Sequence, residues 1–238
     1  MGTIVAIGGG KVAAGDTIKT DKTLKWLTGK KNPQMTFIST ASCSEPSYSR
    51  SMLHHFSAMG FDAMHLNLIL DGYGEAEIRE MIVGADVVYI GEGDVIRLYH
   101  VLRSMRVDSY LREAYDKGVI LAGISAGAMI WFSYGHTDSL SFYTKDWSYS
   151  RFGGLGMIKA FFSPHADKKE RRADFEALYT KGETFPGIAL ENRTAVIYRD
   201  GVCTIIREDE GVNGYVYYPT ADGGFKVHIP AEKEKFDI

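Results

Sequence analysis

Strand and helix signals alternate through the first half of this chain, and this alternation limits the folds open to it more than any other feature. Short apolar runs predict strands at Thr3–Ile7, Met35–Ser39, Ala63–Leu68 and Val87–Ile90. Patterns with helical spacing predict helices at 17–28, Ser51–Met59, Glu75–Val83 and Val95–Met105. Parallel strands joined by right-handed helical crossovers satisfy this order. The predicted fold class is therefore α/β, with a mostly parallel central sheet flanked by helices.

The second half of the chain is less regular. Residues 133–155 are rich in Ser, Tyr, Gly and Asp, which predicts a long surface excursion of the kind that is often functional. A charged amphipathic helix is expected over Lys168–Tyr179, and residues 188–229 carry several short strand signals separated by Gly and Asp turns. Because no linker or repeat interrupts the chain, we expect one α/β domain over residues 1–238, with a C-terminal part rich in short strands.

Composition excludes several classes of partner. The chain has 238 residues, enough to bury one large core, and its 45% hydrophobic content is ordinary for a globular protein. A net charge of −3 gives no basic footprint for nucleic acid. No apolar run approaches the ~18 residues of a membrane span. We therefore expect neither a nucleic-acid partner nor a membrane partner.

Two further observations concern the compartment. The opening residues Met1–Ala6 lack the basic segment of a signal peptide and lead directly into a predicted strand. The two cysteines, Cys43 and Cys203, are too few for a disulfide scaffold. Together these observations favour a cytoplasmic location.

The segment Gly123–Ala128 (Gly-Ile-Ser-Ala-Gly-Ala) carries the strongest chemical signal. It follows the apolar run Val119–Ala122, predicted as a buried strand, and precedes Met129–Phe132, which suits the first turns of a buried helix. This is the G-x-S-x-G pattern in the strand–turn–helix context of a nucleophile elbow. Small residues allow the sharp turn, and free backbone N–H groups at the helix start can bind an oxyanion. Ser125 is therefore a candidate nucleophile.

Three glycine-containing segments are predicted to meet at one edge of the sheet. Gly8–Gly10, Gly91–Gly93 and Ser125 each follow a predicted strand, and ligands of parallel sheets bind beyond the carboxyl ends of the strands. Gly8–Ala13 also matches a loose dinucleotide-binding pattern, but no acidic residue ends the second strand, where a ribose partner would be expected.

A serine nucleophile needs a base, which is usually a histidine oriented by an acid. His165 lies at a predicted strand exit that Pro164 makes rigid, and His228 lies near the C-terminus, where an α/β-hydrolase carries its base. Glu191 directly follows an apolar strand and Asp138 is the competing acid. No cluster of His, Cys, Asp and Glu has the spacing of a metal site.

These motifs, in this order and spacing, resemble the peptidase E and cyanophycinase family of serine peptidases over almost the whole chain. The segments that carry the resemblance are Ile4–Gly10, the glycine loop at 91–94, Gly123–Ala128, Trp131–Ser139, Gly154–Gly156 leading to Ser163–His165, and Gly187–Glu191. The resemblance implies a fold similar to the class I glutamine amidotransferases, with serine where those enzymes carry cysteine.

The resemblance also implies residue roles. Ser125 would be the nucleophile, His165 the general base and Glu191 the third member of the triad, an order along the chain that differs from that of the α/β-hydrolases. The backbone N–H groups of Gly93 and Ala126 would form the oxyanion hole. The implied reaction uses a short peptide substrate with no cofactor and no metal, and a homodimer is a candidate assembly.

One departure from the family concerns the loop Gly91-Glu92-Gly93-Asp94-Val95, where the family usually has Gly-Gly-Asn followed by Thr. Two carboxylates beside an oxyanion site oppose the reaction unless they turn outward or pair with a base such as Arg97. They also repel an acidic substrate side chain and favour a cationic one.

Candidate substrate-binding residues are therefore Glu92, Asp94 and Asp138, together with Arg171, which follows His165 and can meet a carboxylate. The predicted function is a dipeptidase-like serine peptidase that cleaves short peptides through a Ser-His-Glu triad. Two alternatives remain open. One is an esterase of the α/β-hydrolase type that uses His228, and the other is a catalytically weakened peptide-binding protein on the same scaffold.

Overall fold

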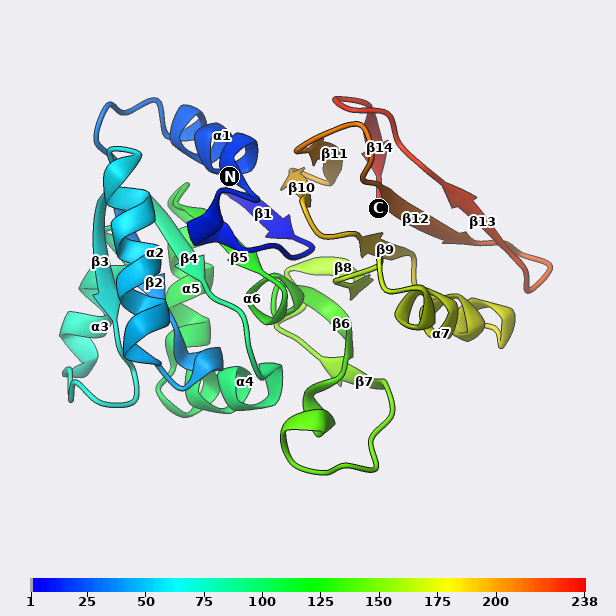
Figure 1. Cartoon of the computed structure of the whole chain (residues 1–238), viewed down its shortest axis with the longest axis horizontal. Helices are drawn as coiled ribbons and strands as arrows, with labels where there is room; N and C mark the ends of the chain where they lie inside the picture. The colour runs from blue at the N-terminus through cyan, green and yellow to red at the C-terminus, as the bar shows by residue number, and fades with distance from the viewer. Residues whose placement is uncertain (1) are drawn as a thin grey trace.

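The computed structural model describes residues 2–238 and contains two β-sheets (Figure 1). The larger sheet has eight strands within the described residues. Their spatial order is β14 (Lys235–Asp237), β11 (Val202–Arg207), β10 (Thr194–Arg199), β1 (Thr3–Ile7), β5 (Ile120–Ile124), β4 (Val87–Ile90), β2 (Gln34–Ile38) and β3 (Asp62–Leu66). The five strands from β1 to β3 in this order are parallel, whereas β10, β11 and β14 are antiparallel additions. The prediction of a mostly parallel central sheet is confirmed.

Helices cover both faces of the larger sheet. On one face, Leu24 of α1 (Ile18–Thr28) and Met52 and Phe56 of α2 (Pro46–Ala58) pack into a core with residues such as Phe37. The opposite face is covered by α3 (Glu75–Val83), α4 (Val95–Ser104), α5 (Val107–Asp116) and the single turn α6 (Ala126–Met129). Alternate residues of each strand face the two cores, as a pleated sheet requires.

A second, smaller sheet is formed by strands from the second half of the chain and lies on the right of Figure 1. Its order is β13 (Phe225–His228), β12 (Gly214–Pro219), β9 (Gly187–Leu190), β8 (Ile158–Ser163), β6 (Phe132–Thr137) and β7 (Ser150–Gly153). Helix α7 (Lys169–Thr180) packs on it through Phe175 and Tyr179. Three short 3-10 turns complete the elements of residues 2–238: η1 (Val12–Ala14), η2 (Thr40–Ser42) and η3 (Ser139–Phe142).

The structure corrects the expectation of a buried helix through Met129–Phe132. Helix α6 ends at Met129, and Phe132 already begins strand β6. The carbonyls of Ile130 and Trp131 accept hydrogen bonds from Leu155 and Met157, at 2.8 and 2.9 Å. Pairing with this distant segment replaces the hydrogen bonds that would have continued the helix.

Two other expectations also change. Helix α5 was not predicted, although its buried residues Val107, Tyr110, Leu111 and Ala114 have helical spacing. The surface excursion expected over 133–155 begins later, because residues up to Thr137 form the largely buried strand β6. The remaining excursion between β6 and β7 projects at the bottom of Figure 1. Among helices of residues 2–238, none has the length and apolar character that crossing a membrane requires.

Candidate active site

Ser125 lies at the carboxyl edge of the larger sheet, between β5 and α6. Its backbone has φ 52° and ψ −110°, and its N–H donates to the carbonyl of Ile7 at 3.0 Å. The two flanking glycines are sterically required. A Cβ on Gly123 would lie 2.2 Å from the Gly127 oxygen, and a Cβ on Gly127 would lie 2.1 Å from the Ile90 oxygen. The backbone therefore makes a tight bend at Ser125 that only glycine permits at positions 123 and 127.

His165 reaches Ser125 from the smaller sheet. It follows β8, has φ 54°, and its N–H donates to the Gly8 carbonyl at 3.0 Å. Its Nε2 lies 2.8 Å from Ser125 Oγ. Both side chains are half-buried, so the pair is within reach of solvent. Burial is the main cause that lowers the pKa of His165, a shift which keeps the ring neutral and able to accept a proton.

The other nitrogen of the His165 ring contacts an amide. Nδ1 lies 2.7 Å from Oδ1 of Asn192, the second residue after β9. Asn192 in turn donates from its backbone N–H to Asp167 Oδ1 at 2.9 Å and from Nδ2 to Asp167 Oδ2 at 3.1 Å. The contacts therefore run in series from Ser125 through His165 and Asn192 to Asp167.

The expected contact between Glu191 and His165 is absent from this arrangement. The Glu191 carboxylate instead accepts hydrogen bonds from the Asn213 N–H at 2.9 Å and the Tyr215 hydroxyl at 2.8 Å, and it lies 3.5 Å from Arg172. The Glu191 N–H donates to the Asn213 carbonyl at 3.1 Å, which aligns this residue with the neighbouring strand connection. The sequence predicts a contact between Glu191 and the His165 ring, whereas in the structure the adjacent residue Asn192 makes that contact through a neutral oxygen acceptor.

The two backbone N–H groups expected to form an oxyanion hole have no acceptor within residues 2–238. They belong to Gly93 and to Ala126, the first residue of α6. Gly93 has φ 132°, a conformation that favours glycine, and a Cβ there would lie 2.3 Å from the Ala41 oxygen. Its loop packs against the bend at Ser125, because a Cβ on Gly127 would also lie 2.8 Å from the Gly91 oxygen.

The two carboxylates of the 91–95 loop have different surroundings. Asp94 is fully buried, where it caps α4 through the Ile96 N–H, accepts from the Tyr143 hydroxyl and lies 3.7 Å from Arg97. It is therefore not open to a substrate, and Arg97 is the basic partner anticipated for it. Glu92 is half-buried, and within residues 2–238 its carboxylate has no hydrogen-bond or ion-pair partner. Burial raises the pKa of Glu92.

Arg171 is buried rather than displayed to a substrate, since its side chain is only 1% exposed. One guanidinium nitrogen donates to the His136 carbonyl, and another lies 3.2 Å from Asp138. The guanidinium also lies over the ring of Tyr149. Asp138 is half-exposed beside it. The structure therefore corrects the role expected for Arg171, whose charge is engaged by neighbours inside the protein.

The alternative base, His228, is not part of the series of contacts that links Ser125 and His165. It lies on β13, at the edge of the smaller sheet, and its Nε2 contacts Glu234 at 2.8 Å. Within residues 2–238, no group of three or more His, Cys, Asp or Glu side chains is arranged to hold a metal ion.

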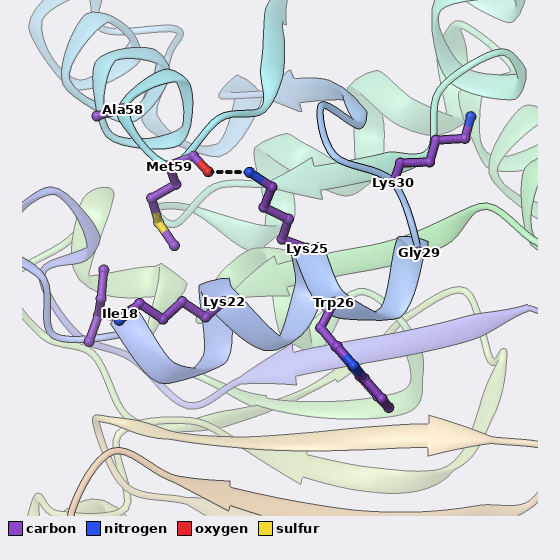
Figure 2. A pocket seen from close by; sticks show the side chains of 8 residues that line it. All are labelled: Ile18, Lys22, Lys25, Trp26, Gly29, Lys30, Ala58 and Met59. Atoms are coloured by element: carbon purple, nitrogen blue, oxygen red, sulfur yellow. Dashed lines mark hydrogen bonds between the residues drawn. The ribbon is translucent and has the colours of Figure 1, made fainter.

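A surface groove elsewhere involves none of these residues. Figure 2 shows it between α1 and the end of α2, where Lys25 spans the groove and donates to the Met59 carbonyl at 2.7 Å. Trp26 is 77% exposed at its margin. The groove is distinct from the site at Ser125.

Comparisons with known proteins concern the family and the fold of the chain. Over 218 residues the chain is 28% identical to the uncharacterized peptidase YgaJ of Bacillus subtilis (strain 168), covering 90% of this chain and 91% of that protein. Its fold is similar to the crystal structure of a peptidase from an acI-B1 Actinobacterium, with a TM-score of 0.76, 18% identity and coverage of 100% and 97% of the two chains. The model of peptidase family S51 matches residues 4–206. The chain therefore belongs to peptidase family S51, and it is a serine-type peptidase.

Proposed function

We propose that this peptidase hydrolyses short peptides, in the manner of a dipeptidase, with Ser125 as the nucleophile and His165 as the general base. The observation that carries the proposal is the 2.8 Å contact between Ser125 Oγ and His165 Nε2 at a strained bend. A hydroxyl and a neutral imidazole at this separation are within the range for proton transfer.

The reaction follows from this geometry. Ser125 Oγ bonds to the substrate carbonyl carbon while its proton passes to Nε2, and the same proton then passes to the leaving amine as the peptide bond breaks. Water, activated by the same nitrogen, hydrolyses the acyl-enzyme. The free N–H groups of Gly93 and Ala126 would bind the oxyanion, and the loss of one such donor costs about 10²–10³ in kcat in a well-studied serine peptidase.

Glu92 supports a more specific proposal about the substrate. A half-buried carboxylate without a cation is unfavourable, so a positively charged group of a bound peptide would stabilise it. We therefore expect peptides with a cationic N-terminal residue to be preferred over peptides with an acidic one.

The test combines a probe with a substrate panel. A fluorophosphonate probe should label the wild-type protein and the Ser133→Ala control, and it should not label Ser125→Ala. Wild type should hydrolyse dipeptides, and Ser125→Ala should lose this activity. Labelling or turnover that persists in Ser125→Ala would refute the proposal.

The substrate preference has its own experiment. In a panel of dipeptides that differ only in the N-terminal residue, kcat/KM should be highest for Lys or Arg and lowest for Asp or Glu. Glu92→Gln should reduce the ratio of kcat/KM for dipeptides with a cationic N-terminal residue to kcat/KM for those with an acidic one. If the substitution leaves this ratio unchanged, Glu92 does not select the substrate.

A further inference from the structure

The histidine of the proposed catalytic pair is held by an amide instead of a carboxylate. From the series of contacts among Ser125, His165, Asn192 and Asp167, we infer that Asn192 is the positioning residue that orients His165, and that Asp167 fixes which way the Asn192 amide faces. This inference rests on the proposed function of Ser125 and His165.

The chemistry of the Asn192 contact determines the tautomer of the ring. Oδ1 can only accept, so the 2.7 Å contact with Nδ1 places the ring proton on Nδ1. Nε2 is then left with a lone pair directed toward the Ser125 hydroxyl at 2.8 Å. This is the tautomer that a general base requires.

The side-chain amide of Asn192 has an oxygen and a nitrogen, and Asp167 determines which of the two faces His165. Its two oxygens accept from the Asn192 N–H and from Nδ2, at 2.9 and 3.1 Å. A flipped amide would bring Oδ1 against the Asp167 carboxylate and turn NH₂ toward the ring. The ring would then have to accept at Nδ1 and carry its proton on Nε2, where it could not act as a base. Asp167 therefore selects the catalytic tautomer of His165 indirectly, through the orientation of the Asn192 amide.

The backbone around these side chains is fixed from three loops. The His165 N–H donates to Gly8 at 3.0 Å, the Ala166 N–H to Leu190 at 2.9 Å, and the Arg193 N–H to Gly9 at 2.9 Å. Gly9 is packed so closely that a Cβ would lie 2.0 Å from Asn192 Oδ1 and 2.4 Å from His165 Nδ1. The amide and the ring are consequently held together by the close approach of this glycine.

The amide also has an electrostatic consequence. A carboxylate at this position would stabilise the imidazolium directly and raise the pKa of His165, whereas a neutral amide does so less. Among the charges around His165, those of Arg171 and Lys168 disfavour protonation of the ring and that of Asp138 favours it. An amide partner therefore leaves the base neutral at lower pH than a carboxylate would.

The test measures the pH profile of kcat/KM and the tautomer of His165 by ¹⁵N NMR in the full-length protein. Asn192→Ala should lower kcat/KM by at least about 100-fold, the lower range for general-base catalysis. Asn192→Asp should move the acidic limb of the profile upward by about one pH unit or more.

Asp167→Asn should yield a mixture of the two ring tautomers and a reduced kcat at little-changed KM. Asp200→Asn, which removes a carboxylate from the β10–β11 turn, is the matched control.

Two results would overturn the inference. If kcat/KM of Asn192→Ala stays within about threefold of wild type, the loss is well below the range for a lost general base, and Asn192 is excluded as the positioning residue. A single Nδ1–H tautomer retained in Asp167→Asn would exclude the orienting role of Asp167. If Ser125→Ala remains active, the proposed function fails instead, but the NMR measurement still tests the contacts, because it does not depend on turnover.

Discussion

At the scale of single residues, the site depends on two strained backbones that face each other. Ser125 and His165 have φ values of 52° and 54°, and such positions cost about 1–3 kcal/mol each in non-glycine residues. The Ser125 N–H donates a hydrogen bond to the carbonyl of Ile7, the last residue of β1, and the His165 N–H donates to the carbonyl of Gly8, the next residue. The strain directs both side chains toward one point, where they meet.

The glycines at this bend provide the first prediction. Gly127→Ala should lower the free energy of unfolding by about 1–3 kcal/mol, because the new methyl group would overlap the Ile90 carbonyl. Gly153→Ala is the control, since a Cβ there meets nothing within 4 Å, and its effect should stay within about 0.5 kcal/mol. Denaturant titration measures both, and equal effects would contradict the steric argument.

The pKa of His165 leads to a second prediction. Because burial lowers this pKa below the ordinary value of 6.5, the ring remains neutral as the pH falls through 6.5. A general base is active when neutral, so the acidic limb of kcat/KM should lie below pH 6.5. A pH profile measured on a non-ionising substrate tests this, and a limb at or above that pH would be inconsistent with it.

At the scale of elements, a buried histidine joins α7 to the smaller sheet. His136 on β6 is 1% exposed, with Nδ1 3.0 Å from Ser163 Oγ and Nε2 2.9 Å from Asp174 on α7. Burial lowers the pKa of His136 to about 4, so this ring is neutral and donates a hydrogen bond to Asp174 instead of forming an ion pair. The interaction positions the helix that follows His165.

The third prediction concerns the pH dependence of stability. Between the ordinary pKa of 6.5 and the folded value of about 4, the unfolded chain binds a proton at His136 that the folded protein does not. Stability should therefore fall as the pH is lowered through this range, by at most about 3 kcal/mol from this residue. Denaturant titrations at several pH values should show this loss, and His136→Gln should reduce the slope of the free energy of unfolding against pH. An unaltered slope in that variant would assign the loss to other groups.

Element prediction succeeded where local patterns agreed with the fold. The strands β1 to β4 and the helices between them follow from apolar periodicity, and the helical spacing of residues such as Val107 and Leu111 carried enough information to find α5. The segment Met129–Phe132 could not be assigned in this way. A short apolar run suits a buried helix or a buried strand equally, and contacts with the 154–158 segment decide between them.

At the scale of the whole molecule, the site is shared by the two sheets. Ser125 follows a strand of the larger sheet, while His165 and Asn192 follow strands of the smaller sheet. The sheets share one core, in which Phe132 and Phe162 stack with ring centroids 4.5 Å apart. The relative position of the sheets therefore determines the distance between the Ser125 hydroxyl and the His165 ring.

The fourth prediction tests this dependence. Phe162→Ala should reduce the free energy of unfolding by about 3–5 kcal/mol, because the ring is fully buried, and should also lower kcat/KM. Phe142→Ala, at a residue that is 57% exposed on the excursion after β6, serves as the control and should stay within about 0.5 kcal/mol. Calorimetry and peptide hydrolysis measure the two effects. Full activity in folded Phe162→Ala would show that the shared core does not position the site.

The amino-acid sequence by itself determined the strand exits, the sharp bend at Ser125 and the placement of His165 after a rigid strand. These features depend on neighbours along the chain, such as Gly123 and Gly127, whose lack of side chains permits the bend. Only the tertiary structure decided that Asn192, and not Glu191, meets the ring, and that α6 ends after one turn. Successive residues at a strand end point in different directions, and the pairing of β9 with β8 and β12 sets which of them faces His165.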